Sequence, residues 1–206
     1  MKIHNNTIHR SAKTISSRLI YAAIFSLIVL TACDNTVQAP YVYKSNLEFT
    51  TGKAEFYGNY FANYQNNNNV ISLSLYSDSL LINNKTSVGQ HLNFDNIFIP
   101  AADSILPEGT YKNDTTGNSF TFIAGTKIIA NGYYQTVGAI LNYWEPLPKN
   151  STSKLITDGT FTVSYNSNHL PTFTLNLTTD DKLKISGTFV GKINYTSAII
   201  KKTKRK

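Results

Sequence analysis

The chain has 206 residues, a formal net charge of +7 and one cysteine. Four of its basic residues lie before residue 19 and five within 201–206, so the part between Cys33 and residue 200 holds ten basic against 12 acidic residues. A body without a basic stripe excludes nucleic acid as a partner, and a lone cysteine excludes a disulfide framework or a cysteine-based zinc site.

The first 32 residues have the layout of an export signal, in which basic residues and no acidic residue precede an apolar run. The run ends at Leu30-Thr31-Ala32-Cys33, which resembles the lipobox of bacterial lipoproteins. This resemblance implies a signal peptide over 1–32, a diacylglycerol on the sulfur of Cys33, and attachment through that lipid to the outer membrane of a Gram-negative bacterium. A retained transmembrane helix is the alternative, but the run over 19–32 has 14 residues and a span needs about 20.

Asp34 follows the cysteine directly, and in this place it resembles an inner-membrane retention signal of enteric bacteria, so the choice between the two membranes stays open. The polar stretch over 33–45 lacks periodicity and is expected to be a flexible tether. We expect one domain over 46–198 and a solvated basic tail over 199–206, with contact to anionic headgroups as the alternative for the tail.

Alternation of apolar and polar residues recurs along the domain, separated by clusters of Gly, Asn, Asp and Pro, and predicts an all-β fold. The first expected strand covers 54–61, with a bulge at Gly58 and a partner at 70–76. Further strands are expected at 92–94, at 97–99 up to Pro100, after the turn at 106–109, and at 120–122.

Asn131-Gly132 is the dipeptide that most strongly favours a tight hairpin, so 127–130 is expected to pair with 133–145. The second of these segments is apolar at odd and at even positions. This pattern predicts a central strand covered on both faces, whose exit residue Trp144 is its most exposed ring.

The last third of the chain predicts three consecutive antiparallel strands, at 161–165, 173–177 and 183–195. Gly187 and Gly191 lie on the inward face of the last of them, where missing side chains allow sharp coiling or admit a large neighbour. The expected architecture is an antiparallel meander of about nine or ten strands, either a barrel-like domain or a two-sheet sandwich.

The order of these segments resembles a group of small all-β lipoproteins of Bacteroidetes-type gut bacteria, most of them of unassigned function. In that group "GTY" and "DGT" turns open strands and a "GxxxG" strand closes the domain. The matching segments are 54–58, 106–111, 157–164, 173–181 and 187–191. The resemblance implies the fold and the cellular address, and it implies no activity.

No catalytic residue, metal site or cofactor is predicted. After Cys33 the only histidines are His91 and His169, and they do not form a pair with metal-ligand spacing. The chain has no nucleophile elbow, His-Glu-x-x-His or P-loop motif. Asp180-Asp181 is interpreted as a turn pair, because adjacent side chains point apart.

The functional hypothesis is based on aromatic residues. Tyr133, Tyr134, Tyr143 and Trp144 lie at the two ends of one expected strand, and their flat rings would suit a glycan or peptide groove. The alternative is ordinary packing of aromatic residues on a pleated sheet. We expect a membrane-anchored lipoprotein that is a non-enzymatic binding or accessory module for a glycan, a peptide or a partner protein. A small hydrolase-type enzyme with a site not readable from sequence is the alternative.

Overall fold

The computed structural model describes residues 42–60, 67–77, 89–144 and 152–199. Their strands are β1 (Asn46–Gly58), β2 (Asn69–Ser77), β3 (Gly89–Ile99), β4 (Gly109–Asn113), β5 (Thr121–Phe122), β6 (Thr126–Ala130), β7 (Tyr133–Val137), β8 (Ala139–Trp144), β9 (Thr152–Tyr165), β10 (Pro171–Thr179), β11 (Lys184–Val190) and β12 (Ile193–Ser197). The all-β prediction is confirmed. These ranges hold more strands than the expected nine or ten, because Gly138 divides 133–145 into β7 and β8 and Gly191 separates β11 from β12.

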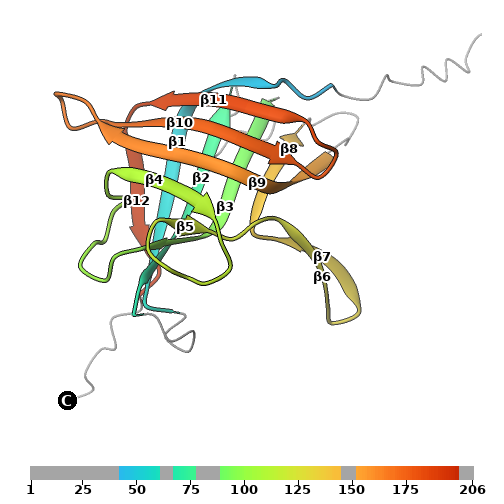
Figure 1. Ribbon diagram of the computed structural model, residues 1–206, viewed down its shortest axis with the longest axis horizontal. Helices are drawn as coiled ribbons and strands as arrows, with labels where there is room; N and C mark the ends of the chain where they lie inside the picture. The colour runs from blue at the N-terminus through green and yellow to red at the C-terminus, as the bar shows by residue number, and fades with distance from the viewer. Residues whose placement is uncertain (1–41, 61–66, 78–88, 145–151, 200–206) are drawn as a thin grey trace, which may run out of the picture. The chain divides into compact units, whose positions relative to one another are not determined.

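Eight of the strands close into a barrel. Each strand of the series β10, β11, β1, β2, β3, β5, β4 and β9 pairs with the next, and β9 pairs back with β10. Figure 1 shows β9, β10 and β11 crossing over β1, β2 and β3. Of the two architectures expected from the sequence, the barrel is therefore the one that forms.

Different strands connect β3 with β9 at the two ends of these strands. The first half of β3 pairs with β8, from Gly89 to Phe94, and its second half pairs with β5. β9 likewise pairs first with β8 and then with β4. β6 and β7 lie between β5 and β8 in the sequence and form a hairpin, which pairs with no other described strand.

The meander is not antiparallel throughout, which corrects the prediction. β1 runs parallel to β11 and β12, and β4 runs parallel to β5. A second closed ring of paired strands passes through β8 and contains seven strands, namely β10, β11, β1, β2, β3, β8 and β9. Neighbouring strands can alternate in direction all the way round only if their number is even, so a ring of seven must contain a parallel pair. That pair joins the first strand to the last ones.

The face predicted for the last strand is confirmed. Ile185, Gly187 and Phe189 point inward and are buried, whereas the residues between them are exposed. A Cβ on Gly187 would lie 3.0 Å from the Leu47 carbonyl oxygen and 3.2 Å from Cε2 of Phe49, so this glycine lets β1 approach closely. An extra residue near Gly191 then shifts the register, and β12 continues along β1.

Aromatic side chains fill the barrel. Phe161 packs at its centre, stacked on Tyr111 with ring centroids 4.6 Å apart and tilted against Phe94 at 5.0 Å. The aromatic contacts continue to Phe173 and from there to Phe189. All five rings are at most 1% exposed. An eight-stranded barrel can be filled by side chains or can hold one small ligand. Here the buried rings contact one another along the interior, so this part of the barrel is a packed core.

Three tyrosine hydroxyl groups form hydrogen bonds with the backbone of the segment between β3 and β4. The hydroxyl of Tyr165 donates to the Leu106 carbonyl at 2.6 Å, and the hydroxyl of Tyr111 donates to the Pro107 carbonyl at 3.0 Å. The Leu106 N–H donates to the hydroxyl of Tyr195 at 3.3 Å. Burial raises the pKa of Tyr111 and of Tyr195. The three hydrogen bonds hold the segment in place, and Leu106 is fully buried.

Candidate functional site

The β6–β7 hairpin forms for the reason that its sequence predicts. Asn131 and Gly132 both adopt positive φ angles, 52° and 79°, as the two central residues of a type I′ turn must. Ala130 is then opposite Tyr133, and the register continues without a shift to Thr126 opposite Val137. The expected pairing of 127–130 with 133–145 is confirmed for 133–136 only.

Both faces of this hairpin carry large apolar side chains that are exposed to solvent. Ile129 and Tyr134 are opposite each other on one face and are 69% and 81% exposed. Ile128 and Tyr133 lie on the other face, at 40% and 75%. Isolated apolar residues on a surface are ordinary, but two on each face of one projecting element make this hairpin the candidate site.

The base of the hairpin is hydrogen-bonded to two strands of the barrel. The Gly138 N–H donates to Oδ2 of Asp95 on β3 at 2.7 Å, and the Gly125 N–H donates to the Ile156 carbonyl on β9 at 2.7 Å. A Cβ on Gly138 would lie 2.2 Å from the Ala124 carbonyl oxygen, and one on Gly125 equally close to that of Ala139. The glycines let the two chain segments cross here, where the chain leaves and re-enters the barrel.

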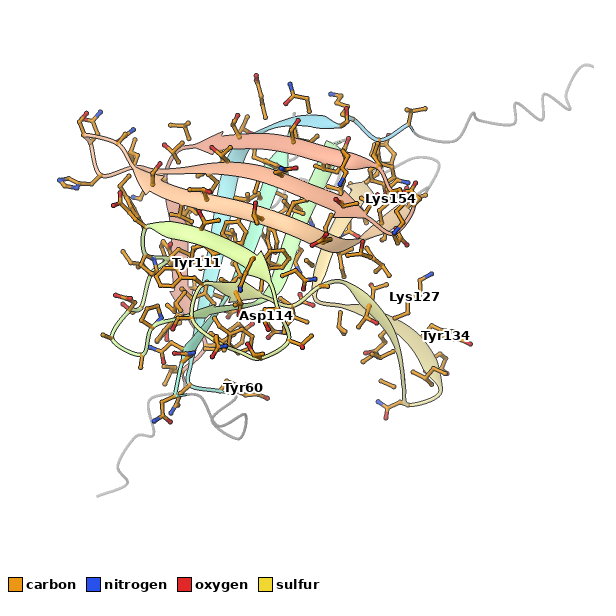
Figure 2. All side chains as sticks on the ribbon, in the orientation of Figure 1. Tyr60, Tyr111, Asp114, Lys127, Tyr134 and Lys154 are labelled. Carbon is orange, nitrogen blue, oxygen red and sulfur yellow. The ribbon has the colours of Figure 1, made fainter. Side chains whose placement is uncertain are left out.

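One charged residue occurs in the hairpin, namely Lys127. It lies opposite Thr136 and on the same face as Tyr134. Figure 2 shows Lys127 and Tyr134 on the hairpin, apart from the barrel strands. Together with Gln135, these residues line an open hollow of about 430 Å³ that follows β7.

The four aromatic residues singled out in the sequence do not form one surface. Tyr133 and Tyr134 lie on β7, whereas Tyr143 and Trp144 lie on β8 in the other sheet. Tyr143 points into the barrel opposite Gln90 and is 5% exposed, so it has no accessible face and does not belong to a recognition surface. Trp144 is 44% exposed, less than either tyrosine of β7.

The interpretation of 133–145 as one strand covered twice was wrong for its first half. β8 is indeed buried, but β7 is exposed on both faces. Apolar residues at odd and even positions describe a covered strand and a fully projecting strand equally well. Gly125 and Gly138, which bracket the hairpin, are the sequence signal that distinguishes the two.

A second hollow lies where the chain enters the barrel. Its walls include Tyr43, Lys154 and Asp181, and its volume is about 440 Å³. Lys154 donates to Asp181 and lies 4.9 Å from the centre of the Tyr43 ring, whose hydroxyl donates to the Thr152 carbonyl at 2.6 Å. The Lys154 ammonium lowers the pKa of Asp181 to about 2, so the pair stays ionised. These contacts hold the segment around Tyr43, which precedes β1, against the barrel. We therefore interpret the hollow as part of the packing of the fold.

His91 is a titratable residue that packs against Tyr76. Its ring stacks on Tyr76 at 4.4 Å with the planes 2° apart, and among the described residues no group hydrogen-bonds its buried Nε2. Burial lowers the pKa of His91 from 6.5 to about 4. Between those values the unfolded chain binds a proton that the folded protein does not, so stability falls as the pH falls.

We expect the free energy of unfolding to drop by about 2 kcal/mol between pH 7.5 and pH 5, as measured by urea titration. His91→Phe keeps a ring on Tyr76 and is expected to remove this dependence. The exposed His169 is the matched control, and His169→Asn should leave the dependence as it is. An unchanged slope in His91→Phe would show that another group is responsible.

Within the ranges that the structure describes, no three residues among His, Cys, Asp and Glu are grouped so that they could hold a metal ion. Those ranges also contain no helix with the length and apolar character needed to cross a bilayer. Cys33, the expected lipidation site, lies outside the described residues.

Compared with protein-family models, with curated proteins and with solved structures, the chain matches none.

Proposed function

We propose that this chain is an exported lipoprotein, anchored through Cys33, that acts as a non-enzymatic binding module and contacts its partner through the β6–β7 hairpin. The lipobox-like sequence supports the anchor. The exposure of the hairpin on both faces is the observation that carries the binding function. A barrel core filled with side chains supports a site on the outside of the domain.

A polypeptide suits this hairpin better than a glycan. Tyr133 and Tyr134 are consecutive in a strand, so their rings project from opposite faces and do not form a two-ring platform for a sugar. A two-stranded hairpin has two edges with unpaired backbone groups, which match the backbone of another chain. Such a hairpin is also marginally stable by itself and gains from a partner that extends it.

The proposed anchor limits where the partner can be. Twelve residues, 34–45, lie between Cys33 and Asn46 at the start of β1. Fully extended, they span at most about 45 Å. The domain is therefore held close to the membrane surface, and we place its partner at or near the same surface.

A binding screen tests the proposal on the polypeptide 35–206. This piece contains every described strand and the whole buried core, and 41–206 is a compact unit. Screened against arrayed glycans and a random peptide library, it is expected to select peptides. The double variant Tyr133→Ser/Tyr134→Ser should lose at least about tenfold in affinity, because aromatic interface residues contribute about 2 kcal/mol each.

The melting temperature of the double variant should stay within a few degrees, since both rings are exposed. Tyr60 provides a matched control, because it is 73% exposed, follows the end of β1 by two residues and lies away from the hairpin, as Figure 2 shows. Tyr60→Ser is expected to bind as the natural sequence does. Binding that survives in the double variant would contradict the hairpin as the site, and selection of glycans alone would contradict the choice of a polypeptide.

A further inference from the structure

The outer edge of β7 lacks the features that normally prevent strand pairing. Exposed sheet edges usually carry lysine, proline or a bulge, which block addition of another strand. β6 has such a residue, Lys127. β7 reads Tyr-Tyr-Gln-Thr-Val, with no charge and no proline, and its pairing with β6 has no bulge.

The turn decides which backbone groups face outward. In a hairpin with a two-residue turn, the flanking residues Ala130 and Tyr133 form a hydrogen-bonded pair, and such pairs alternate with pairs that are not bonded to each other. The register therefore directs the backbone N–H and C=O of Tyr134 and Thr136 away from β6. These groups are two residues apart, which is the repeat at which an added strand forms its bonds.

We propose that β7 accepts an extended segment of a partner polypeptide as a third strand, with a carboxylate of that segment facing Lys127. This inference rests on the proposed function and names its binding mode. The hollow along β7 offers space for a side chain of the added strand, and Lys127 at its wall is the sole charge of a hairpin without acidic residues. Complementarity of charge therefore selects an acidic side chain at that place. A third strand also brings the hairpin to the number of strands at which a small sheet becomes stable.

Charge reversal tests the place of the carboxylate. The probes are fluorescein-labelled seven-residue peptides of alternating Thr and Val, with a central Glu in one and a central Lys in the other. Fluorescence anisotropy with 35–206 should show the Glu peptide binding more tightly, by roughly two- to fivefold, as exposed ion pairs allow. Lys127→Glu should reverse this order. An order that does not change would overturn the assignment of Lys127, and a loss of folding cannot produce a reversal.

Matched proline variants test the edge. Thr136→Pro removes an outward N–H from β7 and should weaken binding more than tenfold, whereas Ile129→Pro removes the corresponding N–H from the β6 edge and should change it by less than about threefold. The reverse result would overturn β7 as the acceptor. A Glu peptide N-methylated at every residue has no N–H donor on either edge and varies the ligand alone, so it keeps the test valid where a proline variant does not fold. Full binding of that peptide would overturn strand addition.

Analytical ultracentrifugation of 35–206 decides between a partner and a second copy. We expect a monomer at micromolar concentration. A dimer that Thr136→Pro abolishes would overturn the proposal in favour of self-pairing. Library peptides that depend on Tyr133 and Tyr134 but ignore both proline variants would leave the proposed function standing and would overturn only the strand addition.

Discussion

Phe189→Asp is expected to unfold the barrel. Phe189 is 1% exposed and packs against Phe173 with ring centroids 5.4 Å apart. Loss of a buried phenylalanine costs about 3–5 kcal/mol, and an unpaired buried carboxylate adds several more. Because domains are stable by only about 5–15 kcal/mol, the variant should show no cooperative melting, or a midpoint lower by roughly 20 °C or more, in circular dichroism.

Thr174→Asp is the matched control for this substitution. Thr174 is exposed on β10, and its neighbours across the sheet are Thr162 and Thr188, which carry no charge. Thr188 itself is less suitable, since it lies opposite Glu48 on β1 and an aspartate there would meet a like charge. We expect Thr174→Asp to shift the melting midpoint by only a few degrees. Equal midpoints for Phe189→Asp and Thr174→Asp would contradict the inward assignment of Phe189.

Cys33→Ala is expected to abolish membrane attachment of the full chain. Under the proposed function the sulfur of Cys33 carries the whole lipid anchor, and each buried CH₂ contributes roughly 0.8 kcal/mol. The basic residues of 201–206 add at most about 1 kcal/mol each at an anionic surface, and salt screens that contribution. After fractionation and a wash at about 1 M salt, the natural protein should stay with the membranes and the variant should be soluble.

Cys33→Ser is a second variant of the same site, and it should behave as Cys33→Ala does, because an oxygen does not accept the lipid in this processing. Substituting all five basic residues of 201–206 by Gln should leave the anchored protein with the membrane. Complete retention of Cys33→Ala after the wash would contradict the lipoprotein proposal. The hairpin proposal would not be affected, because its tests use the polypeptide 35–206.

The alternation of apolar and polar residues was sufficient to predict the strands that bury one face. Within 161–165 of β9, 173–177 of β10 and 183–189, most of which is β11, the apolar residues and Gly187 alternate with polar residues. A shift by one residue would expose each of these sets, so faces and pairing followed from the sequence. The bulge at Gly58 and the hairpin turn at Asn131-Gly132 were also predictable, because few residues tolerate positive φ. The candidate site was predicted only in part: Tyr133 and Tyr134 are in it, but Ile128, Ile129 and Lys127 were not singled out.

The sequence by itself determined the all-β class, the strands with one buried face and the tight turn of the hairpin, since these depend on neighbours along the chain. Only the tertiary structure decided that the first strand closes the barrel by parallel pairing with the last ones, because this depends on how many strands the ring contains. It also decided that β7 projects while β8 is buried. Both strands have apolar residues at odd and at even positions, and what separates their environments is the crossing at Gly125 and Gly138, where the chain leaves and re-enters the barrel.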